Sequence, residues 1–430
     1  MSDWEEMGVY YTTDGMADMF MLLTGYLLPL SMMANWNSMK HSLLFYELMT
    51  SIGAMLLMNF MCQDMTSFYM YFEVSLAPLF MLIGCYGANN RDKAADYMLM
   101  YTTYSSMFML LAMGTYEMTI GNCDYTSISL VVLSTDLQCM LFMALIMGMM
   151  VKTPLVPVHT WLPVVHSESP LAGSMTLAGV MLKLAMYAMM RLMLPSLSDA
   201  TVLYTPMAYL MCLMTMMYTA LITLRQTDLK VIVAYSSMGH MAVCMLGMLS
   251  NSMVGMNGSL VMGMAHGLVS PALFMMVGGM LYDRYHNRLM YYYQGLMTYM
   301  PLLSVYLTML SFCNIGTPLT ANFMGELLSL TGAMGRSVML GSMSALSVLL
   351  SAAYMLKVTN RLTGGMRTPY MALTSDCTYR ESVLMLVLIM PTMYYGMYPN
   401  GMLNMMWQSG DLLYVFMSSV ARRTRRRAMR

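Results

Sequence analysis

The stretch KTPLVPVHTWLPVVHSESPLAGSMTLAGVMLKLAMYAMMR, residues 152–191, decides the fold. It follows the apolar run LFMALIMGMMV and opens on Lys152. Three prolines in its first twelve residues exclude a continuous helix, because proline lacks the backbone donor and clashes with the preceding turn. A second apolar run then begins at Pro170 and carries Lys183 in its middle. In lipid, non-helical backbone survives only beside protein or water, and buried charge is costly, so this stretch predicts part of an ion pathway.

The composition is that of a polytopic membrane protein. Of the 430 residues 58% are hydrophobic and 10% charged, and the mean hydropathy is +0.58. The 68 methionines replace Leu and Ile as spanning residues, which indicates a coding bias rather than a metal-binding stripe. The eight cysteines are scattered without a CxxC motif, so neither zinc nor an iron–sulfur cluster is expected. Six of the 21 basic residues lie in the tail 422–430, and the rest of the chain has a net charge of −6, which argues against nucleic acid as a partner.

At roughly 20 residues per span, the sequence predicts an all-α membrane protein with about twelve transmembrane helices. The expected helices lie near 16–35, 43–61, 65–86, 95–120, 137–152, 170–193, 202–222, 231–249, 258–280, 338–357 and 382–401, with one more, the tenth, that begins near 300. The fifth breaks after Lys152, and the tenth breaks at NIGTPLTANF before Glu326.

The breaks predict two repeats of five helices, each with an interrupted fourth helix. Interrupted helices at matching positions indicate a transporter built from repeats, and an odd number of helices per repeat makes the two inverted. No repeat is visible at the level of single residues. The expected organisation is an N-terminal segment with one helix (1–42), the first repeat (43–194), the second repeat (195–360), a loop with the last helix (361–421) and the Arg-rich tail (422–430).

Basic residues in the loops predict the orientation of the chain. One side receives ten of them: Lys40, Arg91, Lys93, Arg225, Lys230, Arg284, Arg288, Arg361, Arg367 and Arg380. The other side receives Arg191 and Arg336. By the positive-inside rule the first side faces the matrix or cytoplasm, and an even helix number places both termini opposite. The Arg-rich tail conflicts with this, so either the helix count is off by one or an acidic partner or lipid headgroups hold the tail.

The first three candidate site residues are Glu73, Lys152 and Lys183. Lys152 could snorkel to an interface, but the prolines behind it favour a break inside the membrane. Lys183 has some ten apolar or small residues on each side. Glu73 lies in mid-helix, where a carboxylate needs a partner, and Lys152 is the natural one. Burial lowers and a nearby carboxylate raises the proton affinity of a lysine, so such a pair suits proton transfer.

Three more candidates lie in the second half of the chain. His240 and His266 belong to apolar runs, and histidine is the side chain that can titrate near neutrality, although a lone helical histidine is often only a hydrogen-bonded core residue. Glu326 stands at the second break. For His159, within PVHTWLP, a functional role and a role in holding the broken helix are equally supported.

At these residues the chain resembles the subunit 4 family of respiratory NADH:ubiquinone oxidoreductase, complex I. Residues 152–183 are similar to the family signature. The segments YFEVSLAP, DLKVIVAYSSMGHM, MAHGLVSPALF with LYDRYHNR, and NFMGELLSL follow in the family's order. The resemblance covers about residues 43–360. A glutamate at 326 favours subunit 4 over its sister subunits, where a lysine is usual.

The resemblance implies an antiporter-like, proton-translocating subunit of the membrane arm, driven by electron transfer elsewhere in the complex. Its proton-path residues correspond to Glu73, Lys152, Lys183, His240, His266 and Glu326. It implies no cofactor or metal in this chain, with FMN, iron–sulfur clusters and ubiquinone in partner subunits. The expected partners are other complex I subunits, especially neighbouring antiporter-like ones, and membrane lipids, including cardiolipin. The methionine content and the absence of a presequence indicate an organelle-encoded protein of the mitochondrial inner membrane.

Three departures and two rival functions accompany this interpretation. The family usually has fourteen helices, and the first two are missing here. Val165 and Ser169 replace alanines of the signature, and the Arg-rich tail is not a family feature. One rival is a subunit of a cation/proton antiporter without redox partners. The other is a scaffold that has lost pumping, against which the intact set of buried charges argues.

Overall fold

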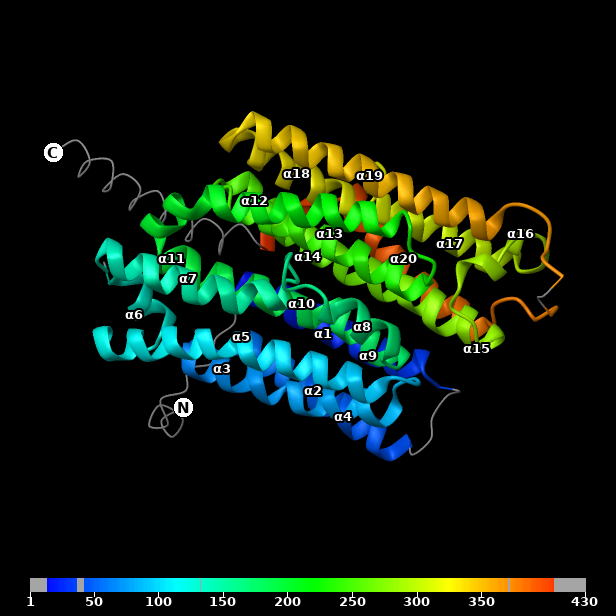
Figure 1. Cartoon of the computed structure of the whole chain (residues 1–430), viewed down its shortest axis with the longest axis horizontal. Helices are drawn as coiled ribbons and strands as arrows, with labels where there is room; N and C mark the ends of the chain where they lie inside the picture. Colours follow the sequence, from blue (N-terminus) through cyan, green and yellow to red (C-terminus); the bar gives the residue numbers. More distant parts are fainter. Residues whose placement is uncertain (1–13, 37–41, 132, 370–371, 406–430) are drawn as a thin grey trace.

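The computed structural model describes residues 14–36, 42–131, 133–369 and 372–405, which form a bundle of helices (Figure 1). Within these ranges the only β-type pairings are two isolated bridges, Asp64 to Asp124 and Asp228 to Leu289. An all-helical chain is expected for this composition, because a helix satisfies its backbone hydrogen bonds internally where lipid offers none.

The helices follow the predicted spans closely. In the first half they are α1 (Gly15–Ala34), α2 (Ser42–Met61), α3 (Met65–Val74), α4 (Leu76–Tyr86), α5 (Arg91–Ile120), α6 (Tyr125–Leu130), α7 (Thr135–Lys152), α8 (Trp161–Glu168), α9 (Leu171–Thr176), η2 (Leu177–Met181), α10 (Leu182–Ala188), η3 (Met189–Met193) and α11 (Leu194–Ser196). In the second half they are α12 (Ser198–Thr223), α13 (Leu229–Met248), α14 (Met253–Phe274), η4 (Met275–Leu281), α15 (Tyr282–Tyr285), η5 (Met290–Tyr292), α16 (Leu296–Tyr299), α17 (Pro301–Ile315), α18 (Ala321–Arg336), α19 (Val338–Thr363) and α20 (Tyr379–Met397).

Nine helical segments of the described chain are long and apolar enough to cross a membrane. They are α1, α2, α3 with α4, α7, α9 through α11, α12, α13, α14 through α15, and α19. The remaining three of the twelve predicted helices are α5, the interrupted pair α17 and α18, and α20. The prediction of an all-α polytopic protein is confirmed.

The two halves of the chain lie side by side, with α1 between them. In Figure 1 the blue to cyan helices α2 through α7 occupy one side of the bundle and the green to yellow helices α12 through α19 the other. Helix α1 packs on α2 and α9 of the first half and on α14 of the second. Its Tyr26 hydroxyl also donates to the Val387 carbonyl of α20 at 2.6 Å. The division of the chain into two repeats at about residue 195 stays a prediction.

Both predicted interruptions are present. Helix α7 ends at Lys152, and the proline-rich segment after it leads into the short helix α8. Helix α17 ends at Ile315 with Gly316 in the left-handed region at φ 74°, where glycine carries no steric penalty. Helix α18 then begins at Ala321. Each interruption therefore lies beside a charged residue of the predicted path.

The halves meet backbone to backbone at Gly179 of η2 and Gly267 of α14. A Cβ at Gly267 would lie 3.2 Å from the Gly179 carbonyl oxygen and 2.7 Å from a methyl group of Leu23. A Cβ at Gly179 would lie 2.5 Å from a methyl group of Leu27. Helix α1 thus covers the junction, and no side chain fits between the two halves at this level.

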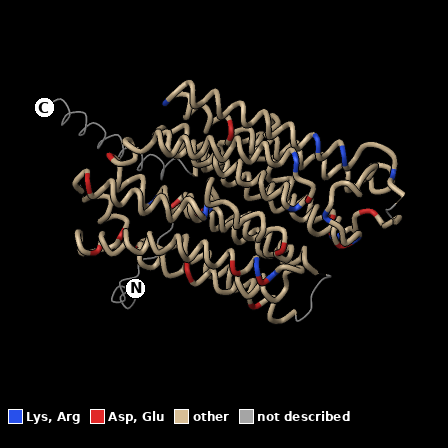
Figure 2. The backbone as a smooth tube through the Cα atoms, in the orientation of Figure 1, with Lys and Arg blue, Asp and Glu red and all other residues tan. Residues whose placement is uncertain are grey.

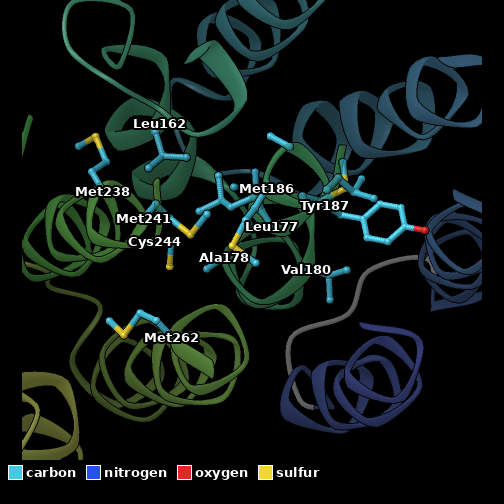
Figure 3. Close-up of a cluster of buried hydrophobic side chains, with 14 of the residues drawn as sticks. Leu162, Leu177, Ala178, Val180, Met186, Tyr187, Met238, Met241, Cys244 and Met262 are labelled. Atoms are coloured by element: carbon cyan, nitrogen blue, oxygen red, sulfur yellow. The ribbon is translucent and has the colours of Figure 1, made fainter. Parts of the chain in front are cut away.

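Methionines fill much of the buried core. Figure 3 shows Met186, Met238, Met241 and Met262 packed among aliphatic side chains and Cys244. All four are fully or almost fully buried. An unbranched thioether suits irregular gaps between helices, so these methionines act as packing residues, as the sequence indicated.

Lysines and arginines gather at one end of the bundle, around α15 and α16 (Figure 2). The opposite end holds the start of α1, where the Arg191 guanidinium pairs with the Asp14 carboxylate. The Met405 backbone lies against Gly15, so the two ends of the described chain meet there. This confirms that they lie opposite the basic loops. The Arg-rich tail 422–430 and Lys40 lie outside the described residues.

Candidate functional site

Lys183 is enclosed completely, with 0% of its surface exposed. It lies in α10, between the π-helical segments η2 and η3, and every residue of α10 and η2 is buried. Its Nζ donates to the Ala178 carbonyl of η2 at 2.5 Å and lies 2.7 Å from His266 Nδ1. A buried ammonium needs such partners, and π-helical turns recur at functional sites. Lys183 and His266 are therefore in direct contact, although 83 positions separate them.

His240 and Glu326 form a second buried contact. His240 Nδ1 lies 3.4 Å from Glu326 Oε1, and both side chains are almost fully buried. On the other side of the ring, Nε2 donates to Asn314 Oδ1 at 3.0 Å. The break in the tenth helix makes room for the carboxylate, because a Cβ at Gly316 would lie 2.5 Å from Glu326 Oε2. The break at Gly316 thus provides the space that the Glu326 carboxylate occupies.

The two contacts join into one line. The rings of His240 and His266 lie 5.7 Å apart between centroids. A cavity of about 20 Å³ borders His240 and Glu326 and is also lined by Thr219, Ser351 and Tyr354. A water molecule needs about 10–15 Å³ and a few polar partners, so this cavity has room for one. Four predicted site residues, Lys183, His266, His240 and Glu326, therefore form a nearly continuous polar line through the centre of the bundle.

The tautomer of His240 determines what the line can do. Because Asn314 accepts from Nε2, the neutral ring offers Nδ1 as an acceptor toward Glu326. Glu326 Oε1 has no hydrogen-bond partner in the described structure and lies 3.4 Å from that nitrogen, so a proton on the carboxyl group would have an acceptor beside it. At the other end, Lys183 can release a proton to His266 Nδ1 while the Ala178 carbonyl holds its remaining hydrogens. The arrangement supports stepwise proton transfer.

Lys152 and Glu73 lie near each other but do not touch. No carboxylate oxygen of the described chain lies within the 4.0 Å of an ion pair from Lys152, so the predicted direct pair is wrong. Lys152 Nζ lies instead 3.9 Å from the centroid of the Phe72 ring. Glu73 is half-buried, and its Oε1 has no hydrogen-bond partner within the described residues. Phe72 of α3 takes the position facing Lys152, and one residue along a helix turns the side-chain direction by about 100°, so Glu73 does not face the lysine directly.

Lys152 also lies apart from Lys183. A cavity of about 10 Å³ borders Lys152 and is lined mainly by apolar side chains, among them Leu177, Met181 and Leu184, with Thr102 as its other polar member. Lys152 itself is buried, so the interpretation that it snorkels to an interface does not hold. The six predicted residues thus form two groups, one connected and one not.

His159 is buried on the proline-rich segment. Its ring meets Tyr218 edge to face at 5.3 Å, and Nδ1 has no hydrogen-bond partner in the described structure. These contacts hold the segment against the second half of the bundle, as the structural interpretation of His159 requires.

Three polar residues of the centre were missed in the sequence. Asn314 lies in the apolar helix α17 and had no charge to draw attention. His166 was taken as part of a motif and is fully buried. Lys230 was counted among loop cations, but it is buried and its Nζ donates to the Ser169 carbonyl at 3.1 Å. Its position on the second residue of α13 made it look like a solvated helix end.

A bundle of spanning helices with two interruptions and titratable groups buried at its centre defines the class of antiporter-like membrane proteins. A known family described as NADH:quinone oxidoreductase/Mrp antiporter, TM, matches residues 62–352. The chain belongs to this family.

Close relatives carry one name. The chain is 73% identical to NADH-ubiquinone oxidoreductase chain 4 of Candida albicans over 97% of its length and 89% of the relative's. It is 71% identical to the protein of the same name from Debaryomyces hansenii, over 96% and 89%. These likenesses confirm the resemblance to the subunit 4 family.

Two solved structures share the fold. A chain of respiratory complex I from Thermus thermophilus superposes with a TM-score of 0.88 at 24% identity, covering 95% of this chain and 86% of that one. A chain of the Mrp complex from Dietzia superposes with a TM-score of 0.85 at 17% identity, covering 94% and 84%. The predicted antiporter-like fold is confirmed.

Proposed function

We propose that this chain is the antiporter-like subunit 4 of the membrane arm of respiratory complex I, where it translocates protons driven by NADH-to-ubiquinone electron transfer. Its 73% and 71% identity to proteins named NADH-ubiquinone oxidoreductase chain 4 supports this assignment. The observation that carries proton translocation is the buried line Lys183–His266–His240–Glu326. Groups so enclosed persist when their charge is used, because unused charge at membrane depth only destabilises.

The proposed path uses all six predicted residues. Protons load Lys152 and Glu73 in the first half, cross the apolar gap to Lys183 through transient water, and pass over the two histidines to Glu326. The line from Lys183 onward needs only side-chain contacts and one or two waters. The gap before it is the step that hydration controls.

Electron transfer takes place in other subunits of the proposed complex. We assign FMN, iron–sulfur clusters and ubiquinone to those partners, and the described residues of this chain hold no group of side chains that could bind a metal ion. Neighbouring antiporter-like subunits and lipids such as cardiolipin cover its outer helices in the mitochondrial inner membrane. The chain is then a part of NADH:ubiquinone reductase without an active site of its own.

An antiporter without redox partners is the less favoured function. The likeness to the Mrp complex shows a shared fold at 17% identity, whereas the relatives above 70% identity carry the name of the oxidoreductase. A scaffold without pumping is disfavoured by the buried line itself.

Purification from native membranes in mild detergent, followed by mass spectrometry, tests the assignment. The expected result is a large complex with flavin and iron–sulfur subunits that oxidises NADH. A small complex without redox partners would contradict the proposal and support the antiporter.

A further inference from the structure

Helices α12 and α19 pack on each other along the outside of the second half of the bundle (Figure 1). Both carry exposed apolar side chains, among them Leu210, Met214 and Leu221 of α12 and Leu346 and Leu349 of α19. Within each helix these residues are three, four or seven positions apart, so they lie along one stripe. The two helices therefore present an apolar surface over the part of the chain that spans the membrane.

Three basic residues lie where this surface reaches the basic end of the bundle. Lys357 of α19 extends to α12, where its Nζ donates to the Leu224 carbonyl at 2.6 Å. Arg225 follows Leu224 directly, and Arg361 lies one turn beyond Lys357 on the same face of α19. The three cations are therefore gathered around a single contact between the two helices.

These cations have charge to offer. Arg225, Lys357 and Arg361 are exposed, and no carboxylate of the described chain lies within 4.0 Å of any of their side-chain nitrogens. An ammonium group has three hydrogens, so Lys357 keeps two after its contact with the carbonyl. Three positive groups without a counter-ion favour an anion that lies between α12 and α19.

The apolar surface next to the cations defines the kind of anion. Guanidinium and ammonium groups donate strong hydrogen bonds to phosphate oxygens, and acyl chains bury their length on exposed apolar side chains. An anionic phospholipid uses both features, and basic pockets between spanning helices suit such headgroups. A soluble phosphate uses the cations alone, and a zwitterionic lipid brings a positive group of its own.

The cavity beside Glu326 lies under the same surface. Its lining includes Ala220 of α12 and Val348 and Ser351 of α19, and the last two are half-buried. Ser351 precedes Lys357 by six residues, which corresponds to about 9 Å along the helix. An acyl chain that starts at the cations and follows the two helices therefore passes over this cavity.

We propose that one anionic phospholipid binds on α12 and α19, with its phosphate held by Arg225, Lys357 and Arg361 and an acyl chain over the cavity beside Glu326. The inference rests on the proposed function only because it needs the chain to lie in a membrane with anionic lipids. The acyl chain then forms the outer wall of the cavity and excludes water from that side.

The test measures lipid binding on the purified complex after its lipids have been depleted in detergent. The probe is phosphatidylglycerol with a photoreactive diazirine on one acyl chain, and mass spectrometry locates the labelled residues. Labelling should fall on α12 and α19, and a phosphatidylcholine probe with the same chains should label them weakly. Excess inorganic phosphate should leave the labelling unchanged.

Lys357→Gln combined with Arg361→Gln should raise the probe concentration for half-maximal labelling by roughly twentyfold, because each basic group near an anionic surface contributes about fivefold. Arg91→Gln combined with Lys93→Gln is the matched control, since it removes two exposed positive charges at the start of α5. The control should change this concentration by less than about twofold, the range of ordinary surface substitutions.

Four results would overturn the site. They are equal labelling by the phosphatidylcholine probe, displacement of the lipid probe by inorganic phosphate, an equal effect of the two double variants, and the absence of label from α12 and α19. The last result would follow if a neighbouring subunit covered this surface.

Two further comparisons keep the test decisive. If Lys357→Gln with Arg361→Gln fails to assemble, Arg225→Gln alone should raise the half-maximal concentration about fivefold, and an unchanged value would overturn the site. Labelling does not depend on proton translocation. Normal translocation in Lys183→Ala would therefore refute the proposed proton path alone, and absent labelling in a complex that oxidises NADH would refute the lipid site alone.

Discussion

The two groups of charged residues differ in how far the chain itself completes them. Around Lys183 the helices are enclosed, with nearly every residue of α10 and α14 buried, and the four charged or titratable groups form a nearly continuous line. Around Lys152 the span of α3 and α4 is 39% buried, and Glu73 is left without a hydrogen-bond partner in the described structure. The group around Lys183 has its contacts within this chain, whereas the environment of Glu73 and Lys152 depends on what packs against α3 and α4.

This difference indicates separate tasks. The connected line from Lys183 to Glu326 holds protons at defined side chains. Lys152 contacts an aromatic ring and is separated from Lys183 by apolar side chains, so its protonation can respond to a charge on a neighbouring group. In the proposed complex, the exposed side of α3 and α4 is where another subunit would act on Glu73. The apolar gap between Lys152 and Lys183 then separates the response of Glu73 and Lys152 from proton transfer along the line that starts at Lys183.

Removing Lys183 should give the largest effect. Lys183→Ala leaves His266 Nδ1 and the Ala178 carbonyl without their donor. Proton translocation by the reconstituted complex should fall on the order of a hundredfold with normal assembly, as for loss of a placed proton carrier. A large loss of proton translocation in Lys152→Ala together with a normal rate in Lys183→Ala would contradict the proposed difference between the two groups.

A double-mutant cycle should measure the contact that only one group has. His240→Gln and Glu326→Gln should couple by about tenfold in translocation rate, because contacting buried groups interact by roughly 0.5–3 kcal/mol. Lys152→Met and Glu73→Gln should be close to additive, since no ion pair joins them. Equal coupling energies in the His240/Glu326 and Lys152/Glu73 cycles would show that the two groups do not differ in direct contact.

The ring beside Lys152 should matter more than its neighbour. Lys152 Nζ lies over Phe72, whereas the buried Phe68 stacks on Phe72 and has no cation contact among the described residues. Phe72→Leu should lower translocation about threefold, as expected from a cation–π contact of about 0.5–1 kcal/mol or more. Phe68→Leu removes similar apolar area and is the control. A larger loss in Phe68→Leu would show that packing alone is measured.

Exposed carboxylates should have the smallest effect. Glu117 lies in the last turn of α5 and is exposed. Glu117→Gln should change translocation by less than about twofold, the range of ordinary surface substitutions. A strong loss would mean that burial does not separate functional from solvated charges here.

The sequence predicted the helices and most of the connected group. Prolines and glycines marked both interruptions, and a charge within an apolar run marked Lys183, His266 and Glu326, because such a charge is costly in lipid. The pairing of Glu73 with Lys152 failed because it depends on the rotation of α3, and one position along a helix turns a side chain by about 100°.

Lys230 and Asn314 were missed for a similar reason, because their roles depend on residues that are distant in the sequence. Lys230 follows a capping aspartate, a pattern typical of a solvated helix start. It is buried because Gly278 of η4 leaves room for its side chain and the Ser169 carbonyl accepts from its Nζ. Asn314 carries no charge and becomes important only because His240 lies opposite it. Neither feature is encoded within a window of neighbouring residues.

The glycine contact between Gly179 and Gly267 restricts how the molecule can move. Transporters that alternate their access rock two halves around a central site, which requires an interface that can open. Here the backbones of η2 and α14 meet at Gly179 and Gly267 without a side chain between them, and α1 packs over this junction. This contact opposes rocking of the two halves at their junction, so we expect directionality to come from side-chain rotation and from changes in the hydration of small cavities.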